Sequence, residues 1–537
     1  MPVVRSRTRT LDVAGLTLAG LLALAAALPA VWWEPLHYDE AVTLNFAPHS
    51  FVTILRQIFV EKGGAPIFFF VEHASLTWPG GIEGLRLPSV LFFVLALPAA
   101  DLVARELCGP VEGILVALCL ALAPLAVSLA TFGRMYSLFL ATSLFATWLC
   151  LRAGRKPSRA RWIFAGTVSG ALVYVHPIAP LYAGLSVAGG MVWSRLPIRR
   201  ALANALPGLI ALAVVAVPYL YALAVLQRRY HVGETGSSLL ATTAGRSVAE
   251  QAVRALTPAG AIGATLASLA ALAGLVSLVR RSPRVAVILA LWLVVPVAFF
   301  SLVPAGGTGG TRFYDRYLIP ALPSFLLLVV SGCLALGSLT GRRVLVGSLL
   351  VAALLGAEAA DDAAHAARLR DLGLRHLVGA VAPERSSVVL FSSTGSAISD
   401  RPPELLAEYV ALELPGIERV DELPALDPRY QRNVVQLGRE DVAAFLAGGD
   451  AERIGLWILR GSPARIPAAV GRLARVETVE SERVSSAIVV VRSRRPAPPR
   501  TLIEQGYLVR QAWSQGSRSA PLVGMILAVD RGALRSS

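Results

Sequence analysis

Residues 11–40, LDVAGLTLAGLLALAAALPAVWWEPLHYDE, decide the fold. Their apolar part, from about 11 to 32, has the length of roughly 20 residues that a helix needs to cross a lipid bilayer. The run is longer than a signal-peptide core, and ten more runs like it follow, so we expect it to be a retained membrane anchor. Arginines precede it, and the acidic pair Asp39 and Glu40 comes shortly after it. The pattern predicts a first span whose far end presents two carboxylates at the bilayer surface.

The further apolar runs fill most of the first 360 residues. Hydrophobic residues make up 55% of the 537-residue chain and charged residues only 16%, whereas soluble domains average about 25% charged. This composition excludes a cytosolic enzyme, a coiled coil and a disordered chain. It predicts a mainly α-helical, polytopic membrane protein of about 11 transmembrane helices. After the first, the expected spans lie near 87–104, 113–131, 137–151, 162–175, 178–194, 201–221, 259–279, 285–303, 318–338 and 344–360.

Basic loops alternate with these spans as the positive-inside rule requires. The four loops predicted to be cytoplasmic contain arginine or lysine and no acid: 152–161, 195–200, 280–284 and 342–343. The long first outer loop, 33–86, instead has six acidic residues against three basic ones. We therefore expect a bacterial plasma-membrane protein with a cytoplasmic N-terminus and, because eleven is odd, an extracytoplasmic C-terminal region. The net charge of +15 comes largely from such loops, so we expect no nucleic-acid partner.

From Asp361 onward the composition becomes that of a soluble domain. Short β-branched runs predict strands at 387–391, 455–459 and 487–492, and helix-like periodicity appears at 402–412, 440–447 and 464–473. We expect a small extracytoplasmic α/β domain over 361–495 and a tail over 496–537 with a helical segment. The transmembrane part, 1–360, is expected to be the catalytic domain.

Asp39 and Glu40 are the candidate catalytic residues. A carboxylate at the membrane surface can act as general base toward a hydroxyl, or help to hold a divalent metal. The alternative is an ordinary acidic pair at the interface. The metal requirement stays open: Asp39 and Glu40 are the candidate ligands, and His37 and His73 could join them. No cofactor is certain, because no His-x-x-x-His or Cys-x-x-Cys spacing supports zinc.

Five stretches occur in a specific order and spacing: Tyr38–Glu40, Ala65–His73, Leu85–Ser89 with Leu102–Leu107, Gly133–Tyr136 and Arg316–Pro323. Over about 1–340 the chain thereby resembles the glycosyltransferase C superfamily of lipid-phosphosugar-dependent membrane transferases. The branch it is most similar to contains the protein O-mannosyltransferases and the lipid A aminoarabinose transferase, and is like glycosyltransferase family 39. The chain departs from that pattern before Pro66, where relatives have His-Pro-Pro and this loop reads EKGGAP from 61 to 66.

The resemblance implies an inverting glycosyltransferase, hexosyl or pentosyl, with Asp39 as base. It would move a sugar from a polyprenyl-phosphate donor to a hydroxyl of an extracytoplasmic glycan, lipid or protein. The donor phosphate calls for cations, and arginine can bond two phosphate oxygens at once. The expected phosphate-binding residues are Lys62, Arg134, Tyr136, Arg312 and Arg316. The expected acceptor or pocket residues are His37, Tyr38, Glu72, His73, His176 and Tyr317.

These residues could also have purely structural roles, and the chain could have a function other than glycosyl transfer. The arginines could instead contact lipid headgroups, and a lone histidine in a turn is more often a capping or interface residue. A transporter or flippase of lipid-linked sugars is the main alternative function. The spans hold almost no central charges and no internal repeat, which disfavours transport. A scaffold that only displays the C-terminal domain is the third hypothesis.

Overall fold

The computed structural model describes the chain in segments, which are residues 2–33, 43, 47, 50–58, 65–75, 82–230, 252–253, 255–257, 261–302, 315–371 and five short strands after them. The chain divides into two compact units: the first holds most of the described helical residues, and the second holds the strands and the end of α17 from His365. Each unit is considered by itself.

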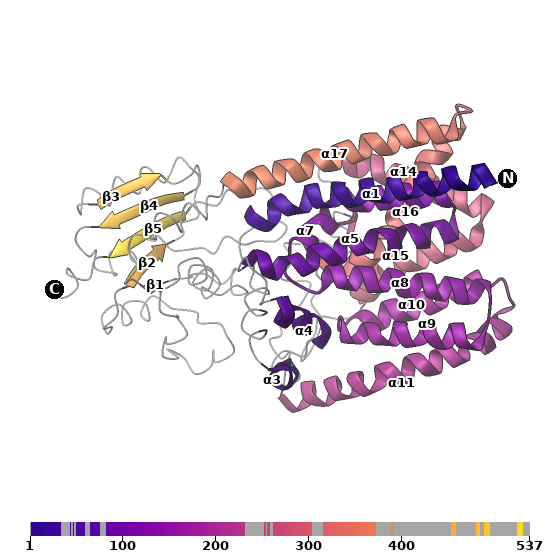
Figure 1. The fold of residues 1–537 in the computed structure, drawn as a ribbon, viewed down its shortest axis with the longest axis horizontal. Coiled ribbons are helices and arrows are strands. Elements are labelled where there is room, and N and C mark those ends of the chain that lie inside the picture. Colours follow the sequence, from indigo (N-terminus) through magenta and orange to yellow (C-terminus); the bar gives the residue numbers. More distant parts are fainter. Residues whose placement is uncertain are drawn as a thin grey trace. The chain divides into compact units, whose positions relative to one another are not determined.

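Helices make up most of the described part of the first unit (Figure 1). Each of the eleven predicted spans lies largely on one or two of them. In chain order they are α1 (Pro2–Trp33), α3 (Phe51–Gln57), α4 (Pro66–Ser75), α5 (Ile82–Leu107), α6 (Pro110–Leu122), α7 (Pro124–Ala130), α8 (Tyr136–Arg155), α9 (Arg159–Ala171), η2 (Leu172–Tyr174), α10 (Ala179–Trp193), α11 (Ile198–Tyr230), α14 (Ala261–Arg281), α15 (Pro283–Leu302), η3 (Asp315–Ala321), α16 (Leu322–Ser338) and α17 (Arg343–Asp371).

Eight helices among the described residues are long and apolar enough to cross a membrane, or nine if α6 and α7 form one span bent by 60°. The bend follows from Pro124, which begins α7 and has no N–H to continue the hydrogen bonds of α6. Helices α9 and α10 have only 13 and 15 residues, fewer than the roughly 20 of a full crossing. The mainly helical, polytopic architecture is confirmed, and the count of eleven spans stays a prediction.

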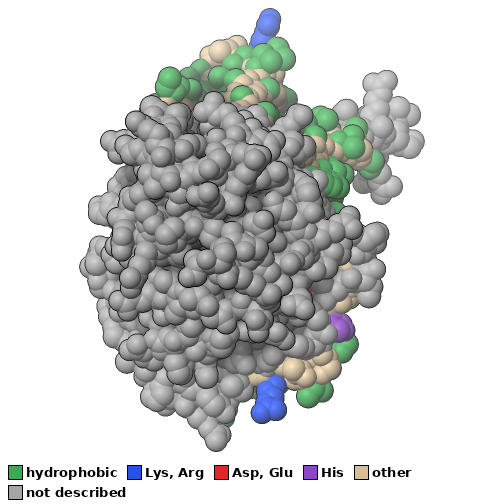
Figure 2. Space-filling model, turned by 90° about the vertical axis from the view of Figure 1, so that its left-hand side faces the viewer, with side chains coloured by type: hydrophobic (Ala, Val, Ile, Leu, Met, Phe, Trp, Pro, Cys, Tyr) green, Lys and Arg blue, Asp and Glu red, His purple; other side chains and the backbone are tan. Residues whose placement is uncertain are grey.

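Large apolar side chains on the outside of this unit identify the lipid-facing surfaces. The described residues of α11 expose eight of them at intervals of three or four residues: Ile198, Leu202, Leu206, Ile210, Val214, Val217, Tyr221 and Val225. Such a continuous stripe is unfavourable in water and suits hydrocarbon. Hydrophobic side chains also predominate among the described residues at the upper edge of Figure 2.

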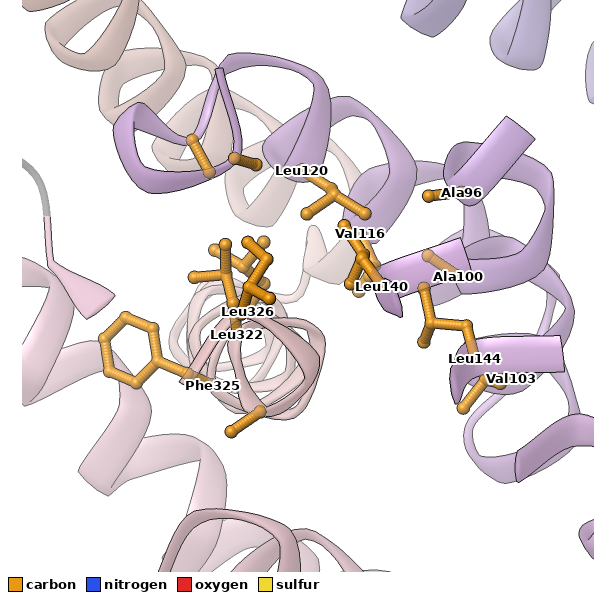
Figure 3. Close-up of a cluster of buried hydrophobic side chains, with 14 of the residues drawn as sticks. Ala96, Ala100, Val103, Val116, Leu120, Leu140, Leu144, Leu322, Phe325 and Leu326 are labelled. Atoms are coloured by element: carbon orange, nitrogen blue, oxygen red, sulfur yellow. The ribbon is translucent and has the colours of Figure 1, made fainter. Parts of the chain in front are cut away.

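The core of the first unit joins helices that are distant in sequence (Figure 3). The labelled part of it comes from α5, α6, α8 and the beginning of α16, and consists of Ala96, Ala100, Val103, Val116, Leu120, Leu140, Leu144, Leu322, Phe325 and Leu326. Glycines bring other helix pairs close together. A Cβ at Gly166 of α9 would collide with the carbonyl of Gly208 in α11, and one at Gly332 of α16 with that of Ala270 in α14. Close contact between small residues is typical of helices in membranes.

Ion pairs gather at the C-terminal end of α8. They join Arg105 to Asp12 and Asp101, Arg155 to Glu106, and Arg343 to Glu112, at distances of 2.6 to 3.0 Å. Helix α8 has 20 residues, which makes it about 30 Å long. These pairs therefore lie a membrane thickness away from the N-terminal end of α8, where the candidate site is found.

The second unit contains a five-stranded mixed sheet in the order β1-β2-β5-β4-β3. Strands β1 and β2 are parallel, as are β4 and β5, whereas β2–β5 and β3–β4 are antiparallel. Ile454 of β2 and Val490 of β4 are register partners of Ala528 and Ile526 in the middle strand, β5. The strand bounds are β1 (Val388–Leu390), β2 (Arg453–Trp457), β3 (Val479–Arg483), β4 (Ile488–Ser493) and β5 (Gly524–Val529).

Three of these strands overlap the predicted ones, and two other features differ from the expectation. The predicted helical tail over 496–537 is wrong at β5, because a short, continuously apolar run such as GMILAV suits a strand paired on both sides and cannot be told from a helix by periodicity. Helix α17 continues past Asp361 to Asp371. The helices predicted for this domain lie outside the described residues, so its α/β class and bounds stay predictions.

Candidate functional site

The turn between α7 and α8 is the centre of the candidate site. It is tight, because the N–H of Arg134 donates to the carbonyl of Phe132 at 2.6 Å. The rings of Phe132 and Tyr136 stack with their centres 5.8 Å apart and 6° from parallel. The turn thus presents Arg134 beside an aromatic pair at the N-terminal end of α8.

Helix η3 brings Arg316 to the same aromatic pair. The guanidinium carbon of Arg316 lies 5.3 Å from the ring centre of Tyr136 and 6.0 Å from that of Phe132. A guanidinium over an aromatic face is attracted by the negative charge of that face. Arg316 is only 8% exposed, so the aromatic rings replace water around much of its side chain. Arg316 thus meets the turn that contains Arg134, although the two arginines come from distant parts of the chain.

Helix α4 of the first long loop contributes a third side of the site. Phe69 is buried, and the guanidinium carbon of Arg134 lies 5.5 Å from its ring centre. Glu72 follows three residues later, which places it on the same side of the helix. Its side chain is fully buried, and its Oε2 accepts a hydrogen bond from the Ser75 hydroxyl at 3.0 Å.

His176 lies in the turn before α10, in contact with the same aromatic cluster. Its ring stacks on Phe139, with the centres 4.8 Å apart, and lies 5.5 Å from the rings of both Tyr136 and Tyr317. Its Nδ1 accepts the N–H of Ile178 at 3.2 Å, so a neutral ring carries its proton on Nε2.

Burial first, and then the positive charges of Arg316 and Arg134, lower the pKa of His176 to about 3. The histidine is therefore neutral at physiological pH. A neutral ring in this place adds no repulsion to the two guanidinium groups.

Helices α10 and α15 fix the position of η3. The Tyr182 hydroxyl of α10 donates to the carbonyl of Tyr317 at 2.7 Å. On the other side, the ring of Phe300 in α15 lies 5.7 Å from the Tyr317 ring. Because Tyr317 adjoins Arg316, these contacts also determine where the guanidinium of Arg316 is held.

The chemistry of this arrangement suits an anion attached to an apolar group. Two arginines offer planar donor groups that bind phosphate oxygens in pairs. The aromatic surroundings exclude water, which strengthens each of these electrostatic interactions. The site can therefore bind a phosphate and stabilise negative charge that develops on it.

Several of the predicted site residues are brought together, and others are not. Arg134, Tyr136, His176, Arg316 and Tyr317 form one cluster, with Glu72 on the neighbouring α4. His73 instead belongs to the pair of helices α3 and α4, where its Nδ1 donates to the carbonyl of Ala47 at 2.6 Å and its ring lies 4.8 Å from that of Phe51. The remaining candidates lie outside the described residues: His37, Tyr38, Asp39, Glu40, Lys62 and Arg312.

The sequence did not predict Phe69, Phe132 and Tyr182 as parts of this site. Phe132 had a usable signal, because it precedes Tyr136 by four residues and borders the Gly133–Tyr136 stretch. Phe69 lies in the aromatic run Phe68–Phe70, and such a run in a membrane protein is also typical of the interfacial belt or the core. Nothing in the local sequence marks Tyr182, whose role depends on a contact with η3.

The described residues contain no group of three or more histidines, cysteines and acids that could hold a metal ion. The two acids expected as ligands, Asp39 and Glu40, are not among those residues. The metal requirement therefore stays open, as it was from the sequence.

Comparison with known proteins adds the following. Residues 68–221 match the family model described as dolichyl-phosphate-mannose-protein mannosyltransferase. None of the curated proteins matches the chain. Among solved structures, ArnT from Cupriavidus metallidurans in the apo state has a TM-score of 0.54 and 14% identity, and the match covers 90% of this chain and 97% of ArnT. The structure of the same protein bound to undecaprenyl phosphate has a TM-score of 0.51 and 13% identity, and the match covers 89% of this chain and 96% of ArnT.

At these identities the solved structures establish the fold, and the family model adds a sequence pattern over α4 to α11. That pattern includes the turn with Arg134 and the turn with His176. The two findings agree with the resemblance found in the sequence. Residues 68–221 are thus similar to the mannosyltransferase family, and the chain shares the fold of ArnT.

Proposed function

We propose that the chain is a membrane glycosyltransferase that moves a sugar from a polyprenyl-phosphate donor to a hydroxyl of an extracytoplasmic acceptor. The observation that carries this proposal is that Arg316 lies on the stacked rings of Phe132 and Tyr136, that Arg134 lies over Phe69, and that both positive charges act on His176. It is supported by the fold shared with ArnT, one structure of which is bound to undecaprenyl phosphate.

Arg134 and Arg316 hold the donor phosphate in this proposal. The bond between the sugar carbon and the phosphate oxygen breaks in the reaction, and the electron pair remains on the leaving polyprenyl phosphate. Cations placed in advance at this oxygen stabilise the developing charge without reorganisation of solvent. Lys62 and Arg312 are proposed as further cations, and Tyr136 as the ring that orients Arg316.

Asp39 is the proposed base. It accepts the proton of the acceptor hydroxyl as that oxygen attacks the sugar carbon, and Glu40 is its neighbour in the acidic pair. A single displacement with the nucleophile opposite the leaving group inverts the configuration at that carbon. His37, Tyr38, Glu72, His73, His176 and Tyr317 are proposed for the acceptor side or the pocket wall.

The proposed orientation puts the N-terminus in the cytoplasm and both the first long loop and the C-terminal region outside, at a bacterial plasma membrane. It is supported by the alternation of basic loops. The C-terminal end of α8, with its cluster of arginines, would then face the cytoplasm.

A transfer assay tests the proposal. Membranes containing the chain are incubated with a panel of polyprenyl-phosphate sugars, each labelled in the sugar, and the label is followed into glycan, lipid and protein fractions. We expect one donor to label one fraction. Lipid-linked sugar that crosses liposome membranes without any transfer would overturn the proposal in favour of a flippase.

A further inference from the structure

The first turns of α5 carry two buried polar side chains, Arg86 and Ser89. They are three residues apart, which places them on one side of the helix. Arg86 is 1% exposed and Ser89 is 0% exposed. Both hydrogen-bond to main-chain carbonyls of other segments, and each of those segments leads to a part of the proposed active site.

Arg86 binds the end of α1. Its Nη1 donates to the carbonyl of Val31 at 2.9 Å. Val31 lies in the last turn of a helix that ends at Trp33, where carbonyls have no partner within the helix and the helix dipole favours a positive charge. The residues that follow this end in the sequence lead directly to Asp39 and Glu40.

Ser89 binds the turn that presents Arg134. Its hydroxyl donates to the carbonyl of Arg134 at 3.0 Å. The N–H of the same residue is bonded to the carbonyl of Phe132. The main chain of Arg134 is therefore held on both sides, which fixes the direction in which its guanidinium leaves the turn.

A fully buried arginine is a costly way to hold two helices together. Between Asp12, which pairs with Arg105, and Val31, the buried residues of α1 are the alanines Ala19, Ala23, Ala27 and Ala30, and such small residues suit helix packing in a membrane. A buried guanidinium is expensive to desolvate and tends to be retained for a specific purpose. Its directional bond to one carbonyl sets a position that apolar packing would leave less defined.

We propose that Arg86 and Ser89 are positioning residues that set the end of α1, at Val31, at a fixed distance from the Arg134 turn. Helix α5 sets this distance, because its backbone holds the two residues about 4.5 Å apart along the helix axis. The inference rests on the proposed function, in which Asp39 and Arg134 act on the same donor and acceptor.

Its geometric part is testable without any sugar transfer. In full-length protein with its cysteines replaced, spin labels at the exposed positions Trp32 and Leu91 report α1 against α5, and labels at Leu91 and Ser128 report α7 against α5. We expect Arg86→Gln to broaden or shift the first distance distribution and to leave the second unchanged. Ser89→Ala should broaden or shift the second distance distribution and leave the first unchanged. Unchanged distributions for both pairs in both variants would overturn the inference.

Two variants control for the chemistry of the substitutions. Arg152→Gln removes an exposed arginine whose guanidinium carbon lies 5.6 Å from the Trp148 ring, near the opposite end of α8. Ser338→Ala removes a hydroxyl that bonds only within its own helix, to the carbonyl of Ala335. Both should leave the two distance distributions as in the wild type. If Arg86→Gln fails to fold, the milder Ser89→Ala still decides the inference.

The catalytic part is read from steady-state transfer. A positioning role predicts that Arg86→Gln and Ser89→Ala lower kcat by about 10-fold or more, while KM for the donor changes less than about 2-fold. Arg86→Lys, which can still donate to the Val31 carbonyl, should recover part of the loss. Shifted distances with wild-type kcat would overturn the positioning role and leave the proposed function standing. A wild-type protein that transfers no sugar would overturn the function, while the spectra would still decide the geometry.

Discussion

Arg316 lies over the ring of Tyr136, with its guanidinium carbon 5.3 Å from the ring centre. Tyr136 begins α8, and Arg316 is part of η3, much later in the chain. The contact joins the early membrane helices, which match the mannosyltransferase family model, to a segment beyond the end of that match. The proposed phosphate site therefore depends on the folding of the whole helical unit.

Substitutions of Arg316 test whether the donor phosphate needs only its positive charge or also its planar guanidinium group. Lysine keeps the positive charge but has no planar fork and stacks less well on Tyr136. We expect Arg316→Lys to lower kcat/KM for the lipid-linked donor by about 10-fold or more, and Arg316→Gln by about 10²- to 10³-fold. Arg152→Gln is the control. An Arg316→Lys protein with wild-type efficiency would show that bidentate binding has no part in the reaction.

Asp39→Asn tests the proposed base. The amide cannot accept the acceptor proton at neutral pH, so we expect transfer to fall by about 10²-fold or more. Binding of undecaprenyl phosphate, followed by thermal stabilisation, should persist because Arg134 and Arg316 are unchanged. Glu40→Gln, at the neighbouring position, is the comparison variant, and it should reduce sugar transfer less than Asp39→Asn does. Full transfer by the Asp39→Asn protein would exclude this residue as the base.

His176 should make the protein sensitive to acid. Its folded pKa is about 3, below the unfolded value near 6.5, so the unfolded chain binds the extra proton first as the pH falls. The stability due to the neutral ring is thus fully present above about pH 6.5, and falls by up to about 1.4 kcal/mol per pH unit between that value and the folded pKa.

The measurement compares melting temperatures of the wild type and His176→Gln in detergent at pH 7.5 and pH 5.5. Other titrating groups are common to both proteins, so we expect the wild type to lose more stability on acidification than the variant does. Equal losses in the two proteins would contradict a neutral, buried His176.

Two glycines offer a matched test of helix packing. A Cβ at Gly332 in α16 would meet the carbonyl of Ala270 in α14, whereas a Cβ at Gly184 in α10 meets nothing within 4 Å. We expect Gly332→Ala to destabilise the protein by about 1 to 3 kcal/mol, because the two backbones must separate. Gly184→Ala should change stability by about 0.5 kcal/mol or less. The comparison is made by thermal or denaturant unfolding, and equal effects would contradict the close approach of α14 and α16.

Much of the helical unit could be predicted from the sequence because membrane insertion is a local property. A run of about 20 apolar residues is driven into hydrocarbon whatever its neighbours are, so the stretches at 11–32 and 201–221 became α1 and α11. Arg134 and Tyr136 could also be proposed, since they lie together in one short stretch that resembles a family. The short apolar run of β5 gave no such guidance, because its pairing with β2 and β4 depends on distant segments.

Only the tertiary structure decided which side chains share the site. No local pattern tells that Arg316 lies on Tyr136, that Phe69 lies beneath Arg134, or that Arg86 reaches the end of α1. Hydropathy determines which segments cross the membrane, and it acts on each segment separately. The directions of side chains between helices are set by packing and by single hydrogen bonds to main-chain carbonyls, which exist only after the helices have come together.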